Sequence, residues 1–154
     1  MLAEGNSAPD FSLPDSSGKL VKLSNFAGKF VVLYFYPKDD TPGCTTEACG
    51  FRDMMKEYGE KGIVILGISP DSPESHAKFA KKYKLPFTLL ADVGAKVAQK
   101  YGVWGEKQMM GRHYMGIFRT TFVIGKSGKI EKVFEGVKPE GHEKEVLEWI
   151  EKAH

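Results

Sequence analysis

The chain alternates between short apolar runs and segments in which apolar residues recur at helical spacing. The run KFVVLYFYP at 29–37 consists mainly of β-branched and aromatic residues, which is typical of a strand buried on both faces of a parallel or mixed sheet. GIVILGIS at 62–69 predicts a second buried strand, and PFTLLAD at 86–92 predicts a shorter third one. With helical segments between them, these runs indicate a strand–helix–strand–helix unit.

A helix is expected between the first two strands. Thr41 can serve as its N-cap, Pro42 suits the first helical position, and Gly62 provides a stop. We therefore expect one continuous helix that runs on until Gly62. Its apolar face should consist of Ala48, Phe51, Met55 and Tyr58.

Two more helices are expected in the middle of the chain. One begins at Ser72-Pro73-Glu74, where serine is a good N-cap and proline suits the first turn. Asp92 is expected to cap the other, which ends at Gly102. The buried face of the first should consist of Phe79, Ala80 and Tyr83.

The two ends of the chain complete the predicted fold. Residues 119–136 read as two strands joined by a Lys-Ser-Gly-Lys turn, and residues 140–154 as a final amphipathic helix. FSLPDSSGKLVKL at 11–23 predicts an additional N-terminal hairpin. The whole indicates an α/β protein with a thioredoxin-like fold, a central mixed sheet flanked by helices, and an N-terminal β-hairpin extension. The final helix should turn inward Val146, Leu147 and Ile150.

Composition restricts the classes of function. With 154 residues, 42% of them hydrophobic, the chain predicts a single domain over residues 1–154. The 22 basic residues exceed the 20 acidic ones by two and are scattered, so we expect no nucleic-acid partner. No leader pattern and no run of membrane-spanning length is found, so we expect a cytoplasmic protein without membrane contact. A solvated helix face is assigned to Lys78, Lys81, Lys82 and Lys84.

The two cysteines carry the chemistry that sets this sequence apart. Cys44 and Cys49 lie five positions apart at the start of the first predicted helix. A helix N-terminus favours a thiolate, because unpaired N–H groups and the positive end of the helix dipole face it. Gly43 leaves room for a small substrate beside the sulfur, and Pro37 ends the strand so that the chain turns over the site. Taken alone, the cysteines fit two buried, inert thiols equally well.

The surrounding residues favour a reactive cysteine. Pro37, Thr41 and Cys44 form a Pro-x-x-x-Thr-x-x-Cys pattern that resembles the active-site motif of the peroxiredoxins. The segments TPGCTTEACGFRD, YGVWGEK and RTTFVI are similar to those of the Q-type subfamily, also called bacterioferritin comigratory proteins. The resemblance extends from about residue 5 to the final helix. It implies a thiol-dependent peroxidase that reduces hydrogen peroxide and organic hydroperoxides without a metal or a bound cofactor.

The resemblance also implies roles for individual residues. Cys44 would be the peroxidatic cysteine, which becomes a sulfenic acid, and Cys49 the resolving one, which forms an intramolecular disulfide with it. Thr41 would donate its hydroxyl toward the sulfur and the peroxide, in addition to its role as N-cap. Arg119 would lie beside the sulfur as a fixed cation.

Two supporting roles are less directly implied. Pro37 would shield the sulfur from bulk water, and Glu47, one turn into the helix, would hold Arg119.

Thioredoxin or glutaredoxin would be the reductant, and because both cysteines lie in one helix, a monomer is expected.

Trp104 is interpreted as a packing residue. Met109, Met110 and Met115 are placed in a Gly-rich loop, either loosely packed or lining an apolar mouth for lipid-like hydroperoxides.

Two other functions are compatible with the cysteines. A general thiol–disulfide oxidoreductase could use the same fold, but that chemistry normally uses Cys-x-x-Cys, and this chain has Cys-x-x-x-x-Cys. A copper(I) chaperone could use both sulfurs and a histidine, since soft thiolates suit that metal. Metal-ligand spacing is absent among the four histidines, which are His76, His113, His142 and His154.

Overall fold

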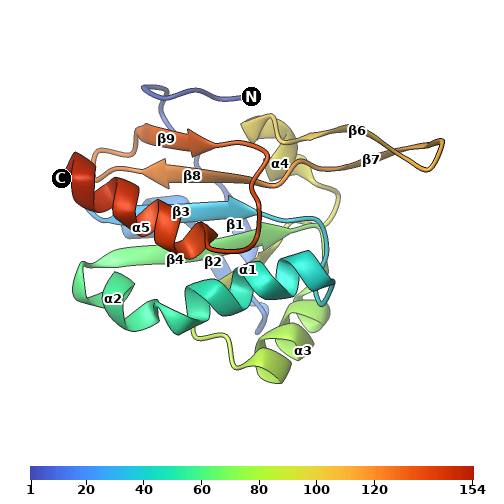
Figure 1. Ribbon diagram of the computed structural model, residues 1–154, viewed down its shortest axis with the longest axis horizontal. Coiled ribbons are helices and arrows are strands. Elements are labelled where there is room, and N and C mark those ends of the chain that lie inside the picture. Colours follow the sequence, from blue (N-terminus) through green and yellow to red (C-terminus); the bar gives the residue numbers. More distant parts are fainter.

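A five-stranded mixed sheet forms the centre of the molecule (Figure 1). The computed structural model describes all residues, Met1–His154. Three parallel strands lie side by side in the order β5-β4-β3, and β8 and β9 continue the sheet in antiparallel orientation. This is the thioredoxin-like sheet that the sequence predicts. Its strands are β3 (Phe30–Phe35), β4 (Ile63–Ser69), β5 (Thr88–Ala91), β8 (Thr120–Ile124) and β9 (Ile130–Phe134).

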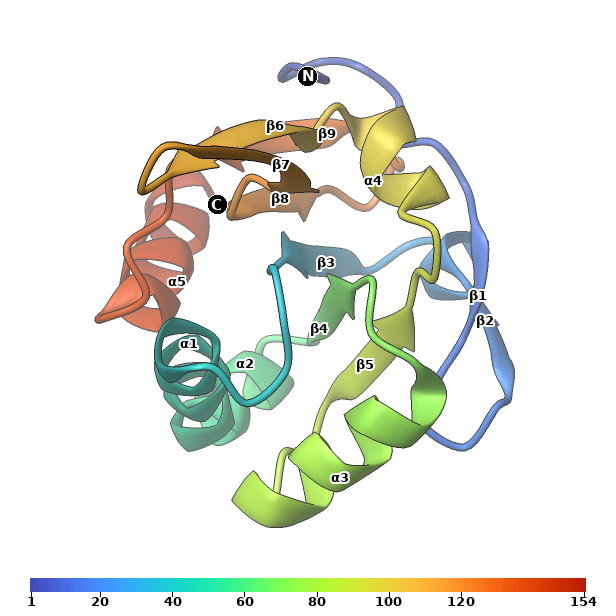
Figure 2. The ribbon, with the colours of Figure 1, turned by 90° about the vertical axis from the view of Figure 1, so that its right-hand side faces the viewer.

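Helices cover both faces of this sheet (Figure 2). Buried side chains from α1, α2, α3 and α5 form one apolar cluster with the sheet, and those from α4 and the N-terminal hairpin form the other. Alternate residues of β3 point to opposite clusters, as the two-residue period of a strand requires. The helices are α1 (Pro42–Asp53), α2 (Met55–Glu60), α3 (Pro73–Tyr83), α4 (Lys96–Tyr101) and α5 (His142–Ala153).

The N-terminal hairpin and most of the helix ends confirm the sequence prediction. Strands β1 (Ser12–Pro14) and β2 (Leu20–Lys22) pair in antiparallel orientation, and a short 3₁₀ helix, η1 (Leu23–Phe26), follows them. The hydroxyl of Ser72 accepts a hydrogen bond from the N–H of Ser75, 3.1 Å away, and so caps α3. In α5, the side chains predicted to turn inward are all buried: Val146, Leu147 and Ile150.

The cap of α4 differs in detail from the prediction. The residue in the N-cap position is Ala95, whose φ of 57° is left-handed, and the helix begins at Lys96. Asp92 still serves the helix, because its carboxylate accepts hydrogen bonds from the N–H groups of Val97 and Ala98. A carboxylate three residues before the N-cap thus satisfies donors that an adjacent cap would otherwise satisfy. The predicted end of the helix at Gly102 is confirmed.

The prediction of one continuous helix up to Gly62 is wrong. The helix ends at Asp53, and Met54, with φ −111° and ψ 13°, separates α1 from α2. The N–H of Met54 bonds to the carbonyl of Phe51, only three residues earlier, which tightens the last turn. Apolar spacing does not reveal this break, because Phe51 and Tyr58 keep helical phase on either side of it. The break leaves Tyr58 buried, with its hydroxyl donating to the carbonyl of Glu143 in α5.

The methionine-rich segment is a hairpin and not the loop that the sequence predicts. Strands β6 (Trp104–Met109) and β7 (Arg112–Ile117) pair in antiparallel orientation and project beyond the body of the molecule (Figure 1). Its two-residue turn, Met110-Gly111, has φ angles of 52° and 78°, as a type I′ turn requires. The three methionines are exposed, with Met110 at 96%, so they are not packed. Trp104, in contrast, packs against the core as predicted.

None of the five helices is both long enough and apolar enough to cross a bilayer.

Candidate active site

The sheet register brings the candidate site residues to one end of β3. Because β3 and β8 are antiparallel, Phe35 at the end of β3 pairs with Thr120 at the start of β8. Arg119 therefore lies beside the loop of residues 37–41 that leads from β3 into α1. Residues separated by 75 positions in the sequence meet there, since Nη2 of Arg119 lies 3.3 Å from Sγ of Cys44.

Cys44 lies in the first turn of α1 and is 1% exposed. The first helical hydrogen bond closes from the N–H of Thr45 to the carbonyl of Thr41, at 2.8 Å. The N–H groups of Gly43 and Cys44 precede this bond and are free for a ligand. A side chain at position 43 would bring its Cβ within 3.2 Å of Nη2 of Arg119, so glycine leaves room for the guanidinium. The sulfur thus lies between a helix N-terminus and a fixed cation.

Glu47 pairs with Arg119 from one turn further along α1. Its Oε1 accepts a hydrogen bond from Nη1 of Arg119 at 2.7 Å, and its side chain is fully buried. The other oxygen, Oε2, has no hydrogen-bond partner. Burial raises the pKa of Glu47 to about 7, although the nearby Arg119 acts to lower it. The predicted contact between Glu47 and Arg119 is therefore present in the structure.

The charge of Arg119 is secured by its two partners. Burial acts to lower the pKa of its guanidinium, but Glu47 and Cys44 more than offset this and raise it above its ordinary value. One nitrogen faces the sulfur and another faces the carboxylate, an arrangement that a planar fork of donors permits. Arg119 can thus hold a negative charge on the sulfur while its own position stays fixed.

Thr41 is in the predicted N-cap position, but its side chain makes no cap hydrogen bond. Its hydroxyl instead donates to the carbonyl of Lys38, 2.9 Å away. The oxygen of this hydroxyl keeps its lone pairs. Pro37 lies just after the buried end of β3 and is itself half-buried.

Cys49 lies further along α1 and is half-buried, and both cysteines are free thiols. Five residues of α-helix separate two Cα atoms by about 8 to 9 Å. A disulfide bridges no more than about 7 Å without backbone movement. The two sulfurs therefore cannot bond while α1 stays helical.

One more cation near the sulfur was not found in the sequence. Lys107 of β6 donates to the carbonyl of Ile117 at 2.5 Å and lies over the ring of Phe118. Burial lowers the pKa of Lys107, and the neighbouring charge of Arg119 lowers it further, while Cys44 acts in the opposite direction. Its sequence context, YGVWGEK, gave a family resemblance but no indication of a charge near the site.

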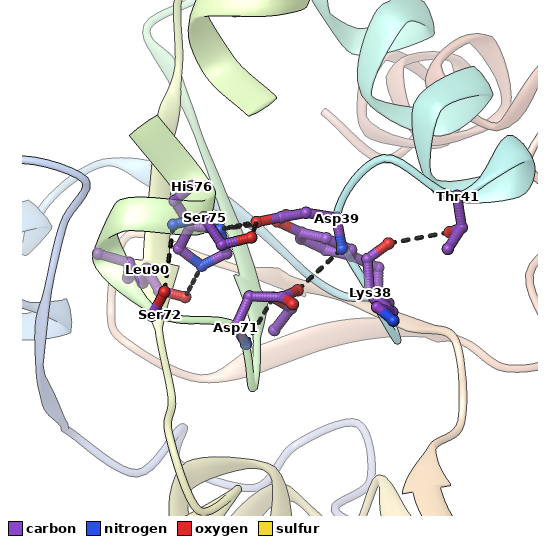
Figure 3. Close-up of polar contacts among 10 residues, drawn as sticks. Lys38, Asp39, Thr41, Asp71, Ser72, Ser75, His76 and Leu90 are labelled. Carbon is purple, nitrogen blue, oxygen red and sulfur yellow. Dashed lines mark hydrogen bonds and ion pairs between the residues drawn. The ribbon is translucent and has the colours of Figure 1, made fainter. Parts of the chain in front are cut away.

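A buried polar network beside the site was also missed (Figure 3). It joins Asp39 of the loop after β3 to His76 of α3, with their side-chain atoms 2.7 Å apart. Together with Asp71, these groups lie within 4.8 Å of one another, a spacing that a metal ion could also use. Their atoms are, however, already engaged in hydrogen bonds with one another and with Tyr36, Ser69, Ser75 and Leu90.

An open groove leads along the N-terminal end of α1. It is bordered by the start of α1 and by the segment that precedes α5. A separate cavity at the other end of β3 contains none of the candidate site residues, which are Pro37, Thr41, Cys44, Glu47, Cys49 and Arg119. The groove is lined by Pro42, Gly43, Thr46, Lys138, Pro139 and Glu140.

Comparisons with known proteins point to one family. Residues 5–133 match the model of the AhpC/TSA family. The chain is 50% identical over 149 residues to "Peroxiredoxin Bcp" of Escherichia coli K12, which covers 97% of this chain and 96% of the relative. It is also 50% identical over 146 residues to "Peroxiredoxin Bcp" of Bacillus subtilis, covering 95% and 93% of the two chains.

Solved structures agree with these sequence relatives. A mutant of PrxQ from Xylella fastidiosa superposes with a TM-score of 0.94 at 32% identity, covering 99% of this chain and 98% of the other. A trapped intermediate/ligand complex of Xanthomonas campestris bacterioferritin comigratory protein, studied for its alkyl peroxide reduction activity, gives a TM-score of 0.88 at 36% identity. Coverage in that case is 93% of this chain and 91% of the other.

Proposed function

This chain belongs to the AhpC/TSA family and is a thiol-dependent peroxidase of the Q-type, or Bcp, peroxiredoxins, and on that premise we propose that Cys44 is its peroxidatic residue. The observation that carries the proposal is the 3.3 Å contact between Sγ of Cys44 and Nη2 of Arg119 at a helix N-terminus. Arg52, whose pKa Cys49 acts to raise, is engaged by Asp53 and by the carbonyl of Tyr83.

The first step of the reaction is attack by the Cys44 thiolate on one peroxide oxygen. An S–O bond forms, the O–O bond breaks, and the departing oxygen leaves as an alkoxide or hydroxide that takes up a proton. Negative charge moves from sulfur to the departing oxygen, so donors fixed beside both atoms favour the transition state. Arg119 and the free N–H groups of the first turn of α1 supply such donors.

Three other residues shape the site in this proposal. Thr41 accepts a hydrogen bond from the bound peroxide through its hydroxyl oxygen, whose hydrogen is donated to the carbonyl of Lys38. Pro37 limits the access of bulk water to the sulfur. Glu47 keeps Arg119 oriented toward Cys44.

The second step is resolution of the Cys44 sulfenic acid by Cys49. The Cys49 thiol attacks the sulfenic sulfur, a disulfide forms and water leaves. Since the helix holds the two residues too far apart, the first turns of α1 must unwind before this bond can form. A dithiol reductant of the thioredoxin type then reduces the disulfide and is itself oxidised, which restores both thiols.

The physiological setting is proposed from the same family membership. We assign organic hydroperoxides as substrates beside hydrogen peroxide, in line with the alkyl peroxide reduction activity named for the Xanthomonas campestris relative. Thioredoxin is assigned as reductant, with glutaredoxin as the alternative. We further propose that the chain works as one domain in the cytoplasm. A monomer is proposed because both cysteines of the cycle lie in one helix.

A comparison of two serine variants tests the assignment. Cys44→Ser should lose peroxide reduction while it keeps its fold, and Cys49→Ser should reduce one equivalent of peroxide and then stop under thioredoxin recycling. The measurements are peroxide consumed per chain, disulfides formed per chain and the far-ultraviolet circular dichroism of each variant. Wild-type peroxidase activity in Cys44→Ser would refute the assignment. Stoichiometric copper in the purified protein, without peroxide consumption, would favour a chaperone instead.

A further inference from the structure

A buried hydrogen-bonded pair lies beneath the loop that leads into α1. His76 is fully buried, and its Nε2 lies 2.9 Å from the carbonyl oxygen of Leu90. A carbonyl only accepts, so Nε2 carries a hydrogen. Its Nδ1 lies 2.7 Å from Oδ2 of Asp39. The two side chains therefore share a short buried hydrogen bond, which joins the loop after β3 to α3.

Asp39 is held from several sides at once. Its Oδ1 accepts from the hydroxyl of Tyr36 at 2.6 Å, and its Oδ2 also accepts from the hydroxyl of Ser75 at 2.8 Å. Its backbone N–H donates to Oδ2 of Asp71, 2.8 Å away (Figure 3). Side chain and backbone of Asp39 are thus both fixed to the segment that contains the N-terminus of α3.

The next residue is fastened to the same helix. Asp40 has a φ of 58°, a left-handed conformation that aspartate adopts more readily than most residues with a side chain. Its carboxylate accepts from Nζ of Lys82 and from the hydroxyl of Tyr83, each at 2.8 Å. These contacts make a second connection between the loop and α3.

The fastened residues directly precede the reactive turn. Lys38, the neighbour of Asp39, offers its carbonyl to the hydroxyl of Thr41, and the carbonyl of Thr41 accepts the first hydrogen bond of α1. We propose that Asp39 and His76 are positioning residues for peroxide attack: their hydrogen bond fixes the loop of residues 37–41, and through it the Thr41 hydroxyl and the first turn around Cys44. The proposal rests on the assignment of Cys44 as the nucleophile.

Because the Asp39–His76 pair lies outside α1, its loss should affect the two steps of the cycle differently. Peroxide attack needs an ordered first turn of α1, whereas resolution needs that turn to open. The Asp39–His76 hydrogen bond lies outside α1, between the loop after β3 and α3. Loosening it therefore removes order that attack requires and removes nothing that resolution requires. Its loss should slow attack and leave resolution equally fast or faster. A misplacement of about 1 Å at a reacting centre can cost as much as a hundredfold in rate.

A matched pair of amides at position 76 tests the proposal. In His76→Asn the amide nitrogen can occupy the place of Nδ1 and donate to Asp39, while in His76→Gln the longer side chain can reach Leu90 but not Asp39. We expect the rate constant for peroxide attack to be at least about tenfold lower in the Gln variant than in the Asn variant. The resolution rate constant should not fall in either. Both are measured by rapid-mixing fluorescence on reduced protein, with circular dichroism as the check on folding.

A second pair at position 39 keeps the test decisive if a variant of the buried histidine does not fold. Asp39→Asn can retain the bond from Tyr36 and donate to Nδ1 of His76, whereas Asp39→Ala loses both hydrogen bonds, so attack should be about tenfold faster in the Asn variant. Equal attack rates within the folded pairs, or a loss of attack and resolution together, would overturn the proposal. Failure of wild-type protein to react through Cys44 would instead overturn the assignment of the nucleophile.

Discussion

Arg119 contacts both Cys44 and Glu47, so one guanidinium serves two side chains of α1. Arg119→Ala should slow peroxide attack by two orders of magnitude or more, consistent with about 3 kcal/mol for one charge-stabilising donor. Rapid-mixing kinetics on the reduced protein measures this effect. Arg119→Lys is the control, because an ammonium keeps the charge but cannot face both partners as a planar fork does. An unchanged attack rate in Arg119→Ala would show that Arg119 has no part in the reaction.

Glu47 makes stability depend on pH. Its pKa is about 7 in the folded protein and near 4.5 when unfolded, so between these values the folded state binds a proton that the unfolded state has released. The free energy of unfolding should therefore fall as pH rises from about 4.5 to 7, by up to about 3 kcal/mol from this group.

Glu47→Gln should remove this fall, because the amide does not titrate. Urea unfolding of reduced protein at pH values below and above the window measures the effect in wild type and variant. Glu57→Gln, which changes an exposed glutamate of α2, is the control and should leave the pH dependence as it is. The same pH dependence in Glu47→Gln as in wild type would contradict the prediction.

At this scale the sequence predicted the residues that belong to a motif and missed those that act across the fold. Cys44, Thr41 and Arg119 were found because their neighbours in the sequence resemble a known pattern. Asp39 and His76 are 37 positions apart, and each alone is an ordinary polar residue, so only the fold reveals them as a pair.

Among the elements, α1 is the one that must change during the cycle. Oxidation of wild-type protein with one equivalent of peroxide should reduce amide-exchange protection in α1 (Pro42–Asp53) and lower the helical signal, because the disulfide cannot form in an intact helix. Hydrogen exchange read by mass spectrometry measures this, and Cys49→Ser, which cannot form the disulfide, should keep its protection. A disulfide between Cys44 and Cys49 with α1 undisturbed would contradict the argument.

The end of α3 offers a separate test of backbone conformation. Lys84 occupies the residue after the helix with a φ of 53°, a conformation that glycine adopts without a steric cost. Lys84→Gly should therefore stabilise the protein by about 0.5–1 kcal/mol. Lys78→Gly, in the exposed interior of the same helix, should destabilise it by about 1 kcal/mol. Urea unfolding of both variants provides the measurement, and a loss of stability in Lys84→Gly would count against it.

Elements were predictable where a single pattern dominates. The buried strands follow from continuous apolar runs, α3 from its capping residue and helical spacing, and α5 from helical spacing. The break at Met54 and the hairpin of residues 104–117 were not predicted. The first preserves the apolar phase, and the second is mostly exposed on both faces, so that neither leaves an apolar pattern to detect.

In the whole molecule, the order of the elements directs the chemistry to one end of the sheet. The predicted strand–helix–strand unit and the antiparallel hairpin specify which strands are neighbours, and the pairing of β3 with β8 then brings Arg119 to the start of α1. The predicted segments were sufficient to indicate a mixed sheet of this class, while the strand order comes from the fold. The hydrogen bonds between the loop after β3 and α3 depend on side-chain geometry that only packing determines.

Oxidation of the methionines in the projecting β6–β7 hairpin should report the exposure of the protein to peroxide. Met109 and Met110 lie in one tryptic peptide, Gln108–Arg112, and Met115 lies in the next, so each thioether converted to sulfoxide adds one oxygen atom to the mass of an identifiable fragment. When reductant is exhausted, the fully exposed Met110 should gain oxygen before the half-buried Met54 and Met55 of the helix break. After digestion, the ratio of oxidised to unoxidised peptide would then measure the peroxide that did not react with Cys44. Earlier oxidation at Met54 or Met55 would contradict this order.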